Sequence, residues 1–318
     1  MNRFRRILVF AEHQQPSALD RVVALARHHN AELSVCDVVP PPPAYLGDDE
    51  TVEQIQRAEL QYAFARLRQF CAQHMDAINA GFTVLTGNPY LAVIQQVIQS
   101  QFDLLVHVRD PACHSGLDTT LAHFARKCPC PVWHLPVDAD DAAADERDIV
   151  VALDRAAQPG ALFGSEMAAN CLRTACAMLP EGGRLHLVHA WMPYGQGWLQ
   201  RPDTPLNPEA FASYVETQRA SYEAWFADAV AGVRSSLPSG LSLTAHLHEG
   251  DLATALQRFA PNDRTALVMG TVGGEAPRGL LIGSNAEALL VGGQRELVLV
   301  KPGTYVSPLH FGDAAETH

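Results

Sequence analysis

The sequence predicts an α/β protein made of two tandem domains, each a five-stranded parallel sheet with helices on both faces. Three observations support this prediction. Short apolar runs alternate with helical patterns along the chain, the runs are continuous as in strands buried on both faces, and the whole order occurs twice. The 318 residues are enough for two ordinary domains, and right-handed crossovers would place the strands of each side by side.

The first predicted domain covers residues 1–137. Its predicted strands are residues 7–11, 33–39, 82–85, 104–108 and 132–135. Its first predicted helix starts at Pro16 and ends near Asn30. Further helices are predicted at about 51–74, in the apolar stretch after Pro89, and at about 119–127. The prolines at 40–43 close the second strand, because proline continues neither a ladder nor a helix.

The second predicted domain covers residues 148–318 and repeats this order after an acidic linker at 138–147. Residues 149–153 match 7–11, and residues 185–190 match the second strand. Gly250-Asp251 with the helix behind it matches Gly87-Asn88. Residues 267–270 match 104–107, and 297–300 match 132–135. Two copies of one α/β unit are the simplest account. Because parallel sheets leave their edges open, the two units are expected to pack as an internal pseudo-dimer, and a second copy of the chain could still pair with it.

Composition argues against several classes of function. The net charge is -12 with acidic residues dispersed outside the linker region, so the basic footprint of a nucleic-acid binder is missing. The start MNRFRRILVF has a basic opening, but Glu12 and His13 interrupt its apolar run, and no stretch approaches a membrane span. A cytosolic protein is expected.

The chain has seven cysteines, an odd number that favours reduced thiols in a chain without a secretion signal. Cys36, Cys171 and Cys176 have apolar neighbours and are predicted to be core residues. A second group lacks the paired spacing of structural zinc sites, so no metal site is predicted. It consists of Cys113, His114, His123, Cys128, Cys130 and His134.

The stretch 267–287 carries the main functional signal. Gly270 and Gly273 stand where a predicted strand ends, and Gly283-Ser284 stands where a helix begins, with nine residues between Gly273 and Gly283. Glycine lets a ligand approach the main chain closely, and the N–H groups at a helix start attract an anion. The spacing alone leaves two interpretations open, a nucleotide site and an ordinary strand-to-helix loop.

This spacing resembles the adenine-nucleotide loop of the universal stress proteins, and Glu287 and Leu290 also fit that family's last helix. The phrase GTVG and the closing VLVKPGTYVSP are most similar to the tandem, E-type members found in bacteria. The resemblance covers nearly the whole chain but is specific only in its second half. It implies Rossmann-like, adenine nucleotide alpha hydrolase-like domains that pair through their final strands.

The resemblance also implies ATP as the ligand, with or without Mg²⁺, bound in the second domain. The family carboxylate at the ribose and adenine end corresponds to Asp154, although an Asp after a strand is otherwise a common turn-former. No loop lysine is present and only Arg278 is positive, so binding would depend on main-chain donors. The expected binding residues are Ala152, Leu153, Asp154, Ala190, Met269, Gly270, Val272, Gly273, Gly283, Ser284 and Asn285.

The first domain departs from the pattern. In the sequence match, His107 replaces the first glycine of the pattern and Asp110 replaces the second. Asp118-Thr119 replaces the Gly-Ser pair, and Glu12 replaces the Asp at the end of the first strand. Bulky and acidic side chains would obstruct and repel a phosphate, so no nucleotide is expected here. A catalytic site built on these residues and His114 lacks a recognisable nucleophile. Because E-type members share this loss, a changed ligand remains an alternative.

Other features have ordinary interpretations. The long helices at about 51–74 and 207–234 carry aromatic residues that are predicted to be core. These are Tyr62, Phe64, Tyr214, Tyr222, Trp225 and Phe226. Residues 193–208 form a Gly- and Pro-rich loop, either a lid or a plain connection, and the tail at 305–318 is expected to fray.

The sequence therefore predicts a stress-response protein that binds an adenine nucleotide as a sensor or adaptor. No general base or metal-binding carboxylate is evident near the loop, so no catalytic residue is assigned and the chain is not expected to be an enzyme. A binding module for another small ligand and a weak ATPase are the alternatives.

Overall fold

The structure is a computed structural model, and the residues it describes are 4–12, 14, 16–46, 50–79, 81–108, 118–136, 148–153, 155, 166–195, 207–259, 265–271 and 296–309. The first half contains β1 (Arg6–Phe10), α1 (Pro16–His29), β2 (Glu32–Val39), α2 (Glu50–Cys71), β3 (Phe82–Thr86), α3 (Pro89–Gln99), β4 (Leu104–Val108), α4 (Thr119–Lys127) and β5 (Val132–Leu135), with short 3-10 turns at Ala44–Leu46 and Ala72–His74. The second half contains β6 (Asp148–Ala152), α5 (Glu166–Met178), β7 (Arg184–Trp191), α7 (Pro208–Ser236), β8 (Ser242–Glu249), α8 (Leu252–Phe259), β9 (Ala266–Gly270) and β10 (Leu297–Val300).

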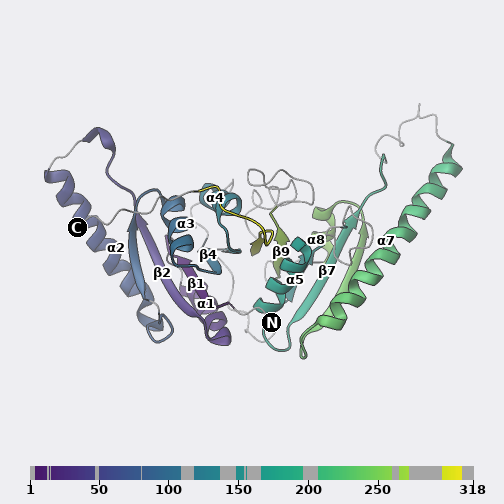
Figure 1. Ribbon diagram of the computed structural model, residues 1–318, viewed down its shortest axis with the longest axis horizontal. Coiled ribbons are helices and arrows are strands. Elements are labelled where there is room, and N and C mark those ends of the chain that lie inside the picture. The colour runs from purple at the N-terminus through teal and green to yellow at the C-terminus, as the bar shows by residue number, and fades with distance from the viewer. Residues whose placement is uncertain are drawn as a thin grey trace.

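The strands form one ten-stranded sheet in the order β3-β2-β1-β4-β5-β10-β9-β6-β7-β8. Within each half the neighbouring strands are parallel, and between the halves β5 and β10 pair antiparallel, with Trp133 opposite Val298. We call this β5–β10 junction the seam. The expected pairing through the final strands is confirmed, and it joins the two halves into one continuous sheet (Figure 1).

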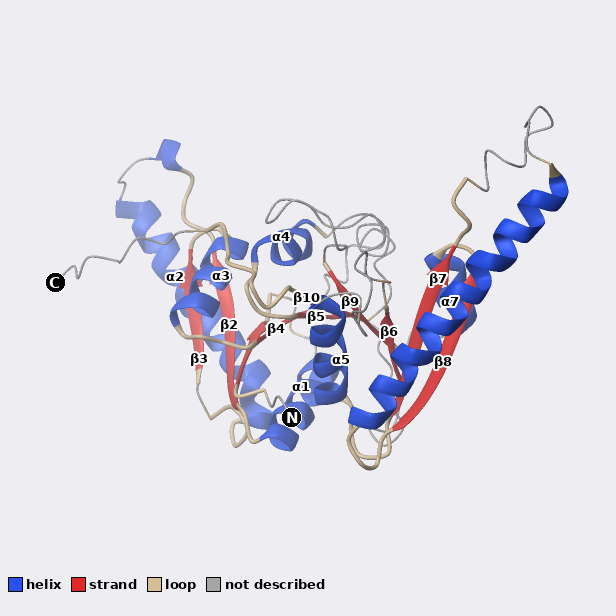
Figure 2. Cartoon of the chain, turned by 45° about the vertical axis from the view of Figure 1, so that its right-hand side comes forward, coloured by secondary structure: helices blue, strands red, loops and turns tan. Residues whose placement is uncertain are grey.

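Helices cover both faces of the sheet. On one face, α1, α2, α5 and α7 pack their apolar stripes against the strands, and on the other α3, α4 and α8 do so. The long helices α2 and α7 lie at the two outer ends of the sheet, whereas α1 and α5 lie near its centre (Figure 2). There the His29 ring donates through Nε2 to the Ala177 carbonyl at 2.6 Å, which links α1 to α5.

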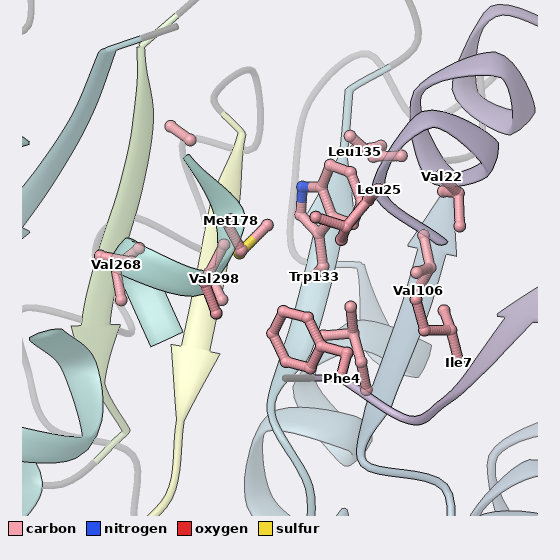
Figure 3. Close-up of a cluster of buried hydrophobic side chains, with 14 of the residues drawn as sticks. Phe4, Ile7, Val22, Leu25, Val106, Trp133, Leu135, Met178, Val268 and Val298 are labelled. Carbon is pink, nitrogen blue, oxygen red and sulfur yellow. The ribbon is translucent and has the colours of Figure 1, made fainter. Parts of the chain in front are cut away.

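The core of the first face runs across the seam. Figure 3 shows Trp133 and Leu25 on one side of it and Val298 and Met178 on the other. Trp133 is fully buried, so its large apolar area contributes to holding the halves together.

The core interpretation of the aromatic residues on the long helices is wrong for two of them. Tyr62 is 69% exposed and Phe64 47% exposed, whereas Phe226 is buried and Trp225 packs against the core. The reason is geometric, because α2 lies over the outer strands and only a narrow stripe of Ala63, Leu67 and Cys71 is buried.

In the part of the chain that the structure describes, no helix is long and apolar enough to cross a bilayer. Its six cysteines are all free, and five of them are buried. Cys36 and Cys171 are core residues as predicted, and Cys176 is half-buried against the core.

Candidate functional site

The candidate site lies at the carboxyl ends of β6 and β9, where the strand order of the second half changes direction. From β6 the chain runs outward to β7 and β8, and it then returns to place β9 on the other side of β6. Ligands of open parallel sheets bind outside the strand ends at such a point. The structure brings five predicted residues to this edge, namely Ala152, Leu153, Ala190, Met269 and Gly270.

The other predicted binding residues lie outside the described part of the chain. They are Asp154, Val272, Gly273, Gly283, Ser284 and Asn285.

The strand registers correct the sequence match between the two halves. Ile7 of β1 pairs with Leu104, whereas Ile149 of β6 pairs with Ala266. Counting along β4 and β9 from these pairs, the residue equivalent to Gly270 is Val108, and His107 is equivalent to Met269. The match of 267–270 to 104–107, which placed His107 at the first glycine, was therefore wrong by one residue.

The structure also gives a reason for glycine at position 270. Its φ lies outside the left-handed region, so the conformational freedom of glycine is not used. A Cβ atom there would lie 2.6 Å from the Cγ of Met167 in α5. A larger residue at position 270 would therefore force the Met167 side chain to shift.

The first half has different residues at the equivalent positions. The buried residues of α1 and α5 follow the same spacing when Ala18 is aligned with Met167. Val108 and Ala18 are both buried, whereas in the second half the Cβ position of Gly270 lies against the larger Met167.

Three neighbouring strand ends differ in the direction expected for a ligand site. On the face covered by α3 and α4, the first half presents Phe10, Val38 and His107, all buried. The registers make their counterparts Ala152, Ala190 and Met269. Ala152 and Ala190 are half-buried, so the second half has lost a phenyl ring and two methyl groups at this edge.

In the first half these side chains fill the edge. The His107 ring stacks on Phe10 with centroids 6.1 Å apart and meets the edge of Phe124 at 5.5 Å. Its Nδ1 lies 3.2 Å from Nδ1 of His134, so one ring donates and the other accepts. Its Nε2 lies 3.8 Å from Asp118 Oδ2, while Asp118 Oδ1 accepts from the Leu121 N–H as the cap of α4. These contacts leave the switch point of the first half occupied by the protein itself.

Sequence patterns did not indicate two further residues at the candidate site of the second half, His189 and Arg155. His189 of β7 is buried and donates through Nδ1 to the Leu153 carbonyl at 2.7 Å, which holds the end of β6. The Arg155 guanidinium lies over the Tyr222 ring at 4.7 Å, and Tyr222 stacks on Trp191 at 4.8 Å. The stacking of aromatic rings between β7 and α7 carried no spacing signal that could have predicted these contacts.

Of the Cys and His group considered for zinc, Cys113 and His114 lie outside the described residues, and the other four do not come together at one point. Cys128 and Cys130 have sulfur atoms 3.6 Å apart, His123 stacks on Tyr90 at 3.9 Å, and His134 faces His107. Among the described residues, no three groups able to ligate a metal come together.

Comparison with known proteins gives a consistent picture. A family model described as the Universal stress protein family matches residues 3–136 and again residues 146–301. No curated protein matches the chain. The chain is similar in structure to a universal stress protein from Archaeoglobus fulgidus DSM 4304, with 15% identity, a TM-score of 0.58, and 94% of this chain and 98% of that chain covered. A protein of unknown function from Pseudomonas aeruginosa PAO1 is similar with 19% identity, a TM-score of 0.55, and 94% and 93% covered.

Proposed function

Because the chain belongs to the universal stress protein family, with two domains of that family in tandem, we propose that it binds ATP in its second half and acts as a sensor or adaptor rather than as an enzyme. The observation that carries the proposal is the exchange of Phe10 and Val38 for Ala152 and Ala190 at the strand ends of the second half. The smaller side chains favour a flat ring that would lie beside main-chain groups. The phrases GTVG and VLVKPGTYVSP favour the E-type branch of the family.

In this proposal the adenine lies over Ala152 and Ala190, with the Ala190 main chain at its edge and Asp154 at the ribose. The phosphates lie beyond Gly270, where Gly273, Gly283, Ser284 and Asn285 would supply main-chain donors. Backbone N–H groups at a helix start favour an anion without any lysine. Mg²⁺ would only add charge neutralisation, so chelation should weaken ATP binding without abolishing it. The six cysteines of the described part of the chain are free, which fits an action in the cytosol.

Titration calorimetry and native mass spectrometry of the full chain test the proposal. We expect one ATP per chain, since the first half is closed by its own side chains. Gly283→Asp should abolish binding by placing a carboxylate against the phosphates. The matched control is Gly116→Asp, the same change in the corresponding loop of the first half, and it should bind ATP as the unmodified chain does. Two ATP molecules per chain, or binding lost in the control alone, would contradict the assignment to the second half.

A half-buried pair of alanines beside Met269 would also accept a flat apolar ligand without phosphates. Mass spectrometry of whatever is released from freshly purified protein on denaturation separates the two ligand classes. A turnover assay addresses weak ATPase activity, with Gly283→Asp as the blank; equal rates in both proteins would indicate a contaminating enzyme.

A further inference from the structure

Two cysteines of the first half lie in contact with each other, away from the proposed nucleotide site. Cys128 is the C-cap of α4, and Cys130 lies two residues before β5. Their sulfur atoms are 3.6 Å apart, close enough for one thiol to donate a hydrogen bond to the other. Both residues are free cysteines, 0% and 7% exposed. The fold therefore holds two reduced thiols side by side.

The local backbone explains why the two sulfur atoms meet. Cys128 is extended, with φ -70° and ψ 131°, and the chain bends at Pro129 and Cys130. The Cys128 N–H donates to the Phe124 carbonyl at 2.9 Å, which ties the first cysteine to the end of the helix. Because the sulfur atoms of a disulfide are about 2.05 Å apart, a bond between these two cysteines requires the thiols to approach by only about 1.5 Å.

The two thiols have different electrostatic surroundings. Lys301 of the second half is 6% exposed and lies near enough to Cys128 for its ammonium to attract a negative charge on that sulfur. The hydrogen bond to Cys128, together with burial, raises the pKa of the Cys130 thiol well above its ordinary value. A thiolate at Cys128 therefore has two favourable neighbours, the ammonium of Lys301 and the S–H of Cys130. This arrangement suits a nucleophilic Cys128 and a Cys130 that keeps its proton.

We propose that Cys128 and Cys130 form a redox modification site that hydrogen peroxide converts into a disulfide. The Cys128 thiolate attacks one peroxide oxygen, so that an S–O bond forms while the O–O bond breaks, and the released hydroxide takes up a proton to give water. The Cys130 sulfur then attacks the sulfur of this sulfenic acid. The S–S bond forms, the S–O bond breaks, and the hydroxyl group leaves with the Cys130 proton as a second water. The two thiols together lose two electrons, and one peroxide is reduced to two waters.

This site is independent of ATP binding, so neither proposal depends on the other. Burial makes the reaction slow, since a buried thiol is rarely ionised. Hydrogen peroxide is little larger than water and can enter through the small local openings that folded proteins undergo. The disulfide removes the charge that Lys301 faces at Cys128. The modification therefore acts where the segment after β10 contacts the end of α4.

Mass spectrometry of the full chain after treatment with hydrogen peroxide tests the proposal. Free thiols are blocked with N-ethylmaleimide in urea, and the chain is then digested with trypsin. The peptide that follows Lys127 and ends at Arg147 contains Cys128 and Cys130 and no other cysteine. After peroxide this peptide should carry no maleimide and should lack two hydrogen atoms. It should carry two maleimides without peroxide, and also when dithiothreitol follows the peroxide and precedes the blocking.

Three variants test the order of the two steps. Cys130→Ser removes the second thiol, so Cys128 should stop at the sulfenic acid and be labelled by dimedone. Cys128→Ser should give no dimedone label on Cys130 in the same time. Cys176→Ser is the matched control, because it changes a half-buried cysteine of α5, and it should form the disulfide as fast as the unmodified chain. Circular dichroism checks that each variant is folded, and the measurement on the unmodified chain needs none of them.

The contrary outcomes are specific. Two maleimides on the peptide after prolonged peroxide treatment would overturn the proposal, provided that the same treatment in urea oxidises the chain. A disulfide from either cysteine to Cys113 would also overturn it, because the pair would then not react as a unit. A dimedone label on Cys130 in Cys128→Ser, with none on Cys128 in Cys130→Ser, would refute the assignment of Cys128 as the nucleophile.

Discussion

At the scale of single residues, the conspicuous glycine at the end of β9 is explained by a neighbour in the core. The Cγ and Sδ atoms of Met167 lie 2.6 and 2.8 Å from where a Cβ of residue 270 would be, closer than real atoms approach. Gly270 therefore has a packing role against Met167, in addition to its place in the glycine pattern of the sequence.

Gly270→Ala should lower the free energy of unfolding by about 1–3 kcal/mol, the usual cost of overpacking. The double variant Gly270→Ala with Met167→Ala lacks the long side chain that the new methyl group would meet, so it should be less destabilised than the sum of the two single changes. Urea denaturation of the four proteins measures the coupling. Additive changes would show that Met167 simply moves aside.

The sequence predicted where the candidate site lies but not how its residues pack. The glycine spacing located the edge of the sheet, but it could not show that Gly270 accommodates Met167 or that Val108 is its counterpart. Alignment of two apolar runs is uncertain by a residue, and only strand pairing removes that uncertainty.

At the scale of elements, the carboxyl end of α4 is capped by residues of the other half. The Lys301 ammonium donates to the Ala125 carbonyl, and the Tyr305 hydroxyl donates to the Arg126 carbonyl. The last carbonyls of a helix lack partners within it and attract a cation. Lys301 is 6% exposed, and this burial lowers its pKa to about 8. The charge of the nearby Cys128 thiolate acts in the opposite sense and raises the pKa.

This pKa predicts a pH dependence of stability. The unfolded chain holds the Lys301 proton up to about pH 10.5 and the folded chain only up to about pH 8. Between these values the unfolded state binds more protons, so the contribution of Lys301 to stability rises with pH and is smallest below pH 8. Lys301→Met should remove that rise. Urea midpoints at intervals from pH 7 to about 10.5 measure the difference between the two proteins, which cancels the other titrating groups. Parallel curves would mean that Lys301 is solvated in the folded chain.

Most elements were predictable because their signals are strong. The strands buried on both faces are continuous apolar runs, and β5 and β10 occur with the predicted bounds. The sequence pattern did not single out α5 or β8. The apolar face of α5 consists mostly of alanine, cysteine and methionine, with Leu172 as its one branched aliphatic residue. The second, β8, is an edge strand whose alternate residues include His246 and His248, so it presents no apolar run.

At the scale of the whole molecule, the two halves share one topology and differ in what occupies the switch point. The first half fills it with Phe10, His107 and Phe124, whereas the second has the half-buried Ala152 and Ala190 at the positions equivalent to Phe10 and Val38. Both halves contribute five strands to the one sheet, and the proposed binding site belongs to the second half. The seam connects them, so its strength decides whether the chain behaves as one unit.

Glu296, the residue directly before β10, is the polar centre of that seam. It is 1% exposed, accepts from the Trp133 indole N–H at 2.7 Å and forms an ion pair with Arg21 of α1. The Arg21 guanidinium also lies 5.8 Å from the centre of the Trp133 ring. Two groups of the first half thus depend on one buried carboxylate of the second.

Glu296→Ala should lower the free energy of unfolding by about 3 kcal/mol, because it leaves the buried indole N–H and the guanidinium without this partner. Arg27→Ala is the control, since it removes an exposed ion pair with Asp76 from the same helix and should cost under about 1 kcal/mol. Urea denaturation followed by tryptophan fluorescence and by circular dichroism measures both variants, and in Glu296→Ala the two probes should separate as the halves uncouple. Equal stabilities of the two variants would show that the β5–β10 pairing and the apolar contacts around Trp133 hold the halves together on their own.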